Sequence, residues 1–171
     1  MPDDAPATDA RHPADVVVAM VEHVLGLAAT WTRWDGTPAV VPVEGEPPRT
    51  YTPHKAVRRV ADHLLDHLAE VEARLAGQAT EPDRWHGSMV TTPADLAPFT
   101  ADDLDEAVSR LRRLAQLWEL RLRSESAGRM DQAEDDAWTL RQVAFHVAGS
   151  DFYADAVGDL SAQIGASTQT P

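Results

Sequence analysis

The stretch YTPHKAVRRVADHLLDHLAEVEARL, residues 51–75, decides the fold class. Its apolar residues recur at intervals of three and four, which is the period of one face of an α-helix. These residues are Val57, Val60, Ala61, Leu64, Leu65, Leu68, Val71 and Leu75. Thr52 is the expected N-cap, Pro53 fits the first helical position, and Gly77 is a natural stop. We predict a helix from Pro53 to Ala76 with one face turned to a core.

Three more segments carry the helical period. The first, residues 15–33, is apolar nearly all round, and Asp15 is its expected N-cap. The second, residues 100–123, opens with TADD, a variant of the capping box. The third opens with the capping box TLRQ at Thr139 and is predicted to continue to residue 164. Four long helices in one chain predict an all-α fold, a four-helix bundle.

The connections are long and rich in proline and glycine. Residues 35–51 and 78–99 exclude a helix, so simple tight hairpins are not expected throughout. Residues 35–51 predict an ordered loop or a short extended pair around residues 40–43. A chain of 171 residues fits one domain, 1–171, and we expect residues 1–12 and 165–171 to be flexible tails.

Composition narrows the classes of partner. Lys and Arg number 15 against 28 Asp and Glu, a formal charge of −13, which disfavours nucleic acid and anionic membrane surfaces. The most apolar run, residues 16–31, carries Glu22 and His23, so we interpret it as a buried or dimer-facing helix rather than a membrane span. The chain has no cysteine and no signal-peptide pattern. We expect a cytoplasmic protein that binds a small molecule, with a homodimer through the first helix as its candidate assembly.

Among seven histidines, His63 and His67 stand four residues apart. That spacing places two imidazoles on one helix face about 6 Å apart along the axis, where they can share a divalent ion. The residue after His63 is Leu64, so the general base of an HExxH zinc protease is missing. Spacing alone leaves a solvated helix edge as the alternative. His146 projects near the middle of the apolar face of the fourth helix, where a hydrogen-bonded core histidine is the alternative to a ligand.

Two helix openings match each other. YTP at 51–53 and WTL at 138–140 each place an aromatic residue before a threonine cap. Counted from the aromatic residue, His146 lies at plus eight, whereas His63 and His67 lie at plus twelve and plus sixteen. The two segments therefore have the pattern of diverged halves with complementary histidines.

The segment WTLRQVAFHVAGSDFYADAV, residues 138–157, resembles the Trp-Thr…His helix of the DinB superfamily, and residues 51–75 resemble its HxxxH helix. This superfamily includes the mycothiol-dependent maleylpyruvate isomerases and related thiol S-transferases. The resemblance covers about 45 of 171 residues. It implies that His63, His67 and His146 bind one divalent metal at one end of a four-helix bundle.

The order of the two segments is the reverse of the usual family order. Moving residues 100–171 ahead of residues 14–99 restores it, so the chain resembles a circularly permuted DinB bundle. The alternative is an unpermuted member that lost its last two histidines and gained a pair in the second helix. Permutation requires His146 to face His63 and His67. Imidazoles separated by more than about 8 Å exclude one shared ion with bonds near 2.1 Å.

Three imidazoles would leave open positions on the ion, as in catalytic sites. Zinc is the default ion, with nickel, iron or manganese as alternatives. Such an ion lowers the pKa of a thiol or activates water, and the resemblance favours the thiol. Because the chain has no cysteine, the thiol would come from a cofactor such as mycothiol. A thiol-dependent transferase or isomerase is therefore expected, with a hydrolase, a metal binder without turnover, or a non-catalytic dimeric bundle with vestigial histidines as alternatives.

Neighbouring residues supply candidates for cofactor binding. Arg59 lies one turn before the histidine pair and would hold a carboxylate of substrate or thiol; a solvated charge is its alternative. Tyr153 lies about two turns beyond His146 and is the second candidate. Asp62 and Asp66 are candidates for orienting a ring, with a solvated acidic face as their alternative.

Overall fold

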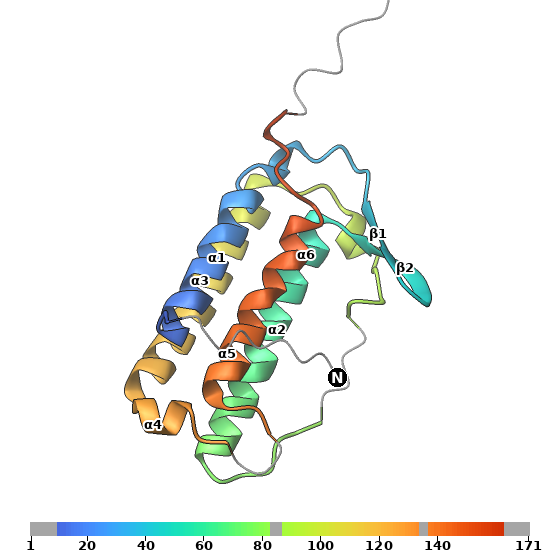
Figure 1. Cartoon of the computed structure of the whole chain (residues 1–171). Coiled ribbons are helices and arrows are strands. Elements are labelled where there is room, and N and C mark those ends of the chain that lie inside the picture. Colours follow the sequence, from blue (N-terminus) through green and yellow to red (C-terminus); the bar gives the residue numbers. More distant parts are fainter. Residues whose placement is uncertain (1–9, 83–86, 134–136, 163–171) are drawn as a thin grey trace, which may run out of the picture.

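Four long helical segments pack side by side in the computed structural model of the chain, with a small two-stranded hairpin near one end (Figure 1). The structure describes residues 10–82, 87–133 and 137–162. The long segments are α1 (Pro13–Ala28), α2 (Pro53–Leu75), α3 (Ala101–Ser124) and the continuous run of α5 (Leu140–Ala148), η3 (Gly149–Asp151) and α6 (Phe152–Asp155). Shorter elements are η1 (Trp31–Arg33), β1 (Ala39–Val43), β2 (Glu46–Tyr51), η2 (Ala94–Leu96) and α4 (Ala127–Met130). The expected tails fall almost wholly outside the described residues.

Local capping signals fix most helix starts. Thr52 caps α2 as predicted, by accepting a hydrogen bond from the Lys55 amide. The capping boxes at Thr100 and Thr139 are both formed, with the side chain and backbone bonds reciprocated. The prediction of Asp15 as the cap of α1 is wrong. His12 is the N-cap, and its Nδ1 accepts a hydrogen bond from the Ala14 amide at 3.2 Å. Pro13 follows it at the first helical position, where a missing amide proton costs the helix no hydrogen bond.

Two predicted helix ends differ from the structure. The first helix, expected to reach residue 33, ends at Ala28 and is followed by the separate turn η1. The fourth, expected to reach residue 164, leaves α-helical geometry after Ala148, passes through η3 and ends with α6 at Asp155. Gly158 then adopts a φ of 75°, a left-handed conformation that favours glycine and ends a helical run.

The helix directions explain the long connections. Figure 1 shows α1 and the α5–α6 run pointing one way, and α2 and α3 pointing the other. Trp118 Nε1 of α3 donates to the Leu64 carbonyl of α2 at 2.9 Å, and Arg121 pairs with Glu72 further along the same two parallel helices. Parallel neighbours require a connection that returns over the length of the bundle, and residues 76–100 supply it. The expectation that simple hairpins would not suffice is confirmed.

The extended pair expected near residues 40–43 is present. Strands β1 and β2 pair antiparallel, with Ala39 opposite Tyr51. Tyr51 is buried and stands directly before the cap of α2. The hairpin therefore anchors an aromatic ring at the start of the helix that carries the histidine pair.

The core lies between the four segments. Its fully buried residues come from every long segment and include Val17, Val21, Val24, Val60, Leu64, Leu111, Trp118, Leu122, Val143 and Val147. By length and composition, the stretch Pro13–Arg33 is apolar enough to cross a membrane, but half of its most apolar window is buried inside the bundle. Its exposed strip includes Glu22, His23 and Gly26, and a dimer through this helix stays a prediction.

Candidate metal centre

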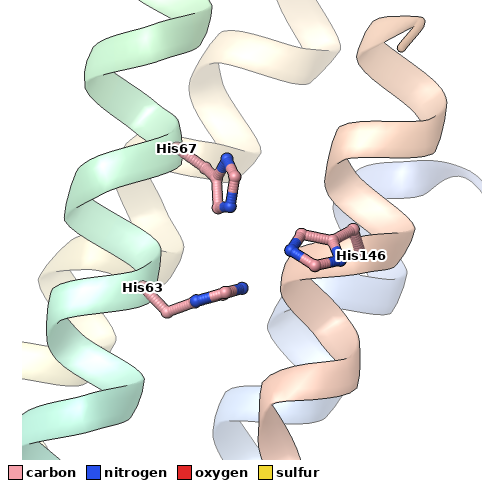
Figure 2. Close-up of side chains that lie close together, drawn as sticks. All are labelled: His63, His67 and His146. Atoms are coloured by element: carbon pink, nitrogen blue, oxygen red, sulfur yellow. The ribbon is translucent and has the colours of Figure 1, made fainter. Parts of the chain in front are cut away.

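Three imidazoles from two antiparallel segments converge on one point. His63 and His67 lie on α2 and His146 lies on α5, and Figure 2 shows their rings turned toward a common space. The ring centroids of His63 and His67 are 4.8 Å apart, and each is 5.0 Å from that of His146. One nitrogen from each ring can be chosen so that all lie within 4.8 Å of one another. The expected facing of His146 and the pair is therefore confirmed.

The donor set fits a divalent ion. A tetrahedral ion with bonds near 2.1 Å separates neighbouring nitrogens by about 3.4 Å, so the widest pair must close by roughly 1.4 Å. Rotation of the imidazole rings about their side-chain torsions covers such a distance. Nitrogen donors of this kind suit zinc, nickel, iron and copper better than calcium or magnesium. Three ligands leave at least one coordination position for a small molecule.

Glu70 holds His67 in place, and the sequence reasoning missed it. His67 Nδ1 donates to Glu70 Oε2 at 2.8 Å, because a carboxylate can only accept. That hydrogen bond, more than any other contact, holds the pKa of Glu70 below its ordinary 4.5. With Nδ1 engaged, His67 presents Nε2 to the cluster. A carboxylate behind a histidine fixes its tautomer and raises its basicity toward a metal.

Arg74 extends this link to the opposite helix. Its Nη1 lies 3.4 Å from Glu70 Oε1, and its Nη2 donates to the backbone carbonyl of Trp138 at 2.6 Å. The Trp138 ring packs on His146, with centroids 4.7 Å apart. The two helices that carry the ligands are therefore joined beside the cluster. The spacing of Glu70, three residues after His67, was the sequence signal that could have found it.

The predicted setting of His146 was wrong. It lies at an exposed edge rather than in the middle of the apolar face, because α5 buries Leu140, Val143, Ala144 and Val147 instead. The sequence projection treated residues 139–164 as one regular helix, but η3 interrupts it. Partial desolvation of the ring, and then the charge of His67, lower the pKa of His146 from its ordinary 6.5. Both effects favour the neutral imidazole that a metal requires.

The two predicted cofactor-binding residues lie beside the cluster. Arg59 is only 7% exposed, so the alternative of a solvated charge is wrong. Its guanidinium carbon lies 5.4 Å from the centre of the Tyr153 ring, and that ring lies 6.4 Å from the ring of His63. Tyr153 is buried, and its hydroxyl is 3.2 Å from Ser88 Oγ. Whether either residue contacts a cofactor stays a prediction.

Asp62 serves the arginines rather than a histidine ring. Its Oδ2 lies 3.3 Å from Arg59 Nη1 and 3.8 Å from Arg58 Nη1. The expectation that Asp62 orients an imidazole is therefore wrong, and the carboxylate that bonds to a histidine of the cluster is that of Glu70. The same expectation for Asp66 stays a prediction.

Comparisons of the chain with protein-family models, with curated proteins and with solved structures returned no match.

Proposed function

We propose that His63, His67 and His146 bind one divalent metal ion, and that the chain is a metal-dependent enzyme of the DinB kind. The observation that carries this is the convergence of three imidazoles from opposite halves of the chain, with nitrogens within 4.8 Å of one another. Chance surface histidines have no reason to meet across two helices with a carboxylate bonded behind one of them. Zinc is the proposed ion, with nickel, iron or manganese as alternatives.

The proposed reaction uses a low-molecular-weight thiol such as mycothiol in group transfer or isomerisation. When bound, the ion would supply an open coordination position and lower the pKa of a thiol placed there. The chain has no cysteine, so no side chain of its own competes as a thiol. Glu70 orients His67, and Tyr153 and Arg59 border the cluster on the side of the hairpin. The cytoplasm, a reducing compartment, is the proposed location.

The proposal includes a circular permutation of the DinB helix order. The facing of His146 and the pair is what permutation requires. In Figure 1, α1 begins at the end of the bundle opposite to where α6 ends. A permutation joins such ends only through a connection as long as the bundle, and residues 76–100 show that this fold accommodates one.

Cobalt substitution tests the proposed function. The metal-free protein is loaded with one equivalent of Co²⁺ and titrated with mycothiol, and with S-methyl mycothiol as a control that lacks a free thiol. We expect the visible bands of a four- or five-coordinate cobalt, followed by a near-ultraviolet thiolate-to-cobalt band only with the thiol. Cobalt spectra that do not respond to any thiol would contradict thiol chemistry. His23→Ala serves as a matched control, because His23 lies outside the cluster and pairs with Asp155.

A further inference from the structure

Five side chains follow one another at four-residue intervals into and along α2. They are Tyr51, Lys55, Arg59, His63 and His67. The last two belong to the metal centre, and the first three lie on the same stripe of the chain towards the hairpin. Tyr51 is 1% exposed, Lys55 0% and Arg59 7%. Arg59 is buried one turn before the candidate metal centre and Lys55 is buried two turns before it. Two buried cations so close together require an explanation.

Lys55 makes no direct ion pair with a described residue, and the charge of Asp95 acts on it only at longer range. Its Nζ lies 3.0 Å from the Ser88 carbonyl oxygen and 3.0 Å from Thr91 Oγ1, and 5.2 Å from the centre of the Tyr51 ring. All three partners are uncharged. Burial, and then the charge of Arg58, lower the pKa of Lys55, and the charge of Asp95 offsets only part of that effect. An uncompensated buried charge is costly and is normally paired.

Two hydrogen-bonding groups next to Lys55 are also unused. Arg59 Nε and the Tyr51 hydroxyl are buried and lack a partner at ideal hydrogen-bond geometry; Arg49, whose Nε is likewise unpartnered, lies close enough to the Tyr51 hydroxyl to interact with it. The Arg59 guanidinium has a carboxylate contact through Nη1, at 3.3 Å from Asp62 Oδ2, but Asp62 is shared with Arg58. Burial raises the pKa of Tyr51, so its hydroxyl keeps the proton and can donate. The group thus combines one excess positive charge with two free donors.

The geometry relates this group to the histidines. The Tyr51 and Tyr153 rings are 5.8 Å apart, the Arg59 guanidinium faces Tyr153, and Tyr153 faces His63. Arg59 precedes His63 by four residues and Lys55 precedes it by eight, which is about 6 Å and 12 Å along the helix axis. The axial separations lie within the length of one small molecule.

We propose that Lys55, Arg59 and Tyr51 form a subsite for the carboxylate of a small molecule whose thiol lies at the histidine cluster. This inference rests on the proposed function and narrows its ligand class to a thiol that carries a free carboxylate, which mycothiol itself lacks. One carboxylate balances the charge of Lys55 and accepts from Arg59 Nε and the Tyr51 hydroxyl. At Lys55 Nζ, the carboxylate of the ligand takes the place of the Ser88 carbonyl oxygen, which is a neutral acceptor. In a chain with a formal charge of −13, such a local positive site also selects where an anion can bind.

The alternative role of the two cations is structural. Lys55 ties down the segment that contains Ser88 and Thr91, and the backbone at Gly87 packs against Arg59 so closely that an added Cβ would lie 2.5 Å from Nη1. A purely structural role predicts that substitutions change stability without changing any preference for anions. The two roles therefore separate by experiment.

The first arm of the test uses Co²⁺-loaded protein. It is titrated with unbranched mercaptocarboxylates of two to six carbons, and with mercaptoalcohols of the same lengths as uncharged partners. We expect the thiolate-to-cobalt band to saturate at about tenfold lower concentration for the carboxylate at the best chain length, as befits a charge-assisted contact. In Lys55→Met and Arg59→Met, the ratio between the saturating concentrations of the alcohol and the carboxylate should fall toward one, while the cobalt content stays unchanged. Arg112→Met, which removes an exposed arginine paired with Glu22, should keep the full preference.

The second arm uses chelator-treated protein without metal. At matched ionic strength, the best mercaptocarboxylate should raise the unfolding temperature more than its alcohol partner, and Lys55→Met should abolish the difference. Equal behaviour of acid and alcohol in both arms, or an unchanged preference in both methionine variants, would overturn the subsite. A failure of the proposed function shows differently, because cobalt then gives no thiolate band with any thiol while the metal-free arm still reads the subsite.

Discussion

Glu70 lies one helical turn beyond His67, and its carboxylate accepts a hydrogen bond from His67 Nδ1 at 2.8 Å. This contact selects Nε2 as the donor atom of His67. Removing such a partner typically lowers metal affinity by about 10–100-fold while leaving the ligands intact. We expect that loss for Glu70→Ala in a competition titration against a chromophoric chelator. Glu72→Ala is the matched control, because Glu72 pairs with Arg121 away from the cluster; equal affinities in the two variants would contradict the role of Glu70.

Metal affinity should depend on pH in a defined direction. Protons compete with the ion for imidazole nitrogen, so binding should weaken as the pH falls through about 6.5. The lowered pKa of His146 keeps that ring neutral below its ordinary 6.5, and it therefore remains a ligand in the upper part of this range. Metal retained after equilibrium dialysis between pH 8 and pH 5 measures the effect. Retention that stays flat across this range would argue against histidine ligation.

The contact between Asp95 and Arg58 ties the return connection to α2. Asp95 is buried, and its carboxylate accepts from Arg58 Nε at 3.1 Å and Nη2 at 2.8 Å and from the Thr92 amide at 2.7 Å. Burial alone would raise the pKa of Asp95, but these hydrogen bonds outweigh it and lower the pKa below 3.8. We expect Asp95→Asn to reduce the free energy of unfolding by about 1–3 kcal/mol at pH 7.

The sign of the pH effect follows from that lowered pKa. A group with a depressed folded pKa stabilises the fold above its unfolded value and loses the contribution as the pH falls through the folded pKa. The difference in stability between the wild type and Asp95→Asn should therefore narrow below pH 3.8 in urea unfolding. The exposed Asp105→Asn serves as the control and should show no comparable gap. A gap that is constant down to pH 2 would refute the assignment.

Trp118 supports α2 from the neighbouring helix α3. It is fully buried, and its Nε1 donates to the Leu64 carbonyl at 2.9 Å. Trp118→Phe removes that bond and leaves a gap, so we expect a loss of about 1–3 kcal/mol in unfolding free energy. The affinity for metal should change by less than about twofold if the contacts beside the cluster, rather than the packing of Trp118, fix the histidine positions. Trp34→Phe, which loses a hydrogen bond in a half-buried loop, is the control; a large affinity change in Trp118→Phe alone would show that the packing sets the site.

Local signals made α2 predictable. Thr52 and Pro53 specify its start chemically, and the apolar period requires no knowledge of the partner helix. The face of His146 was not predictable in the same way, because it depends on where α5 gives way to η3. The regular projection at 100° per residue places residues correctly only while the helix stays regular.

The surroundings of the site depend on tertiary contacts that spacing does not show. Glu70, Asp62 and Asp66 all stand within one turn of a histidine, and only the side-chain geometry selects Glu70 for His67. Arg59 was expected to be more often solvated than buried. It is buried because the distant residue Gly87 packs on its guanidinium, a contact that no helical period encodes.

The metal content of the protein decides whether the three histidines bind an ion. The chain is purified without a metal-affinity tag, incubated with Zn²⁺, desalted and subjected to elemental analysis, beside His63→Ala, His67→Ala, His146→Ala and the control His23→Ala. We expect about one equivalent of metal in the wild type and the control, and its loss in each of the three cluster variants. Wild-type protein that retains no metal, or cluster variants that retain as much as the control, would contradict a three-histidine metal centre.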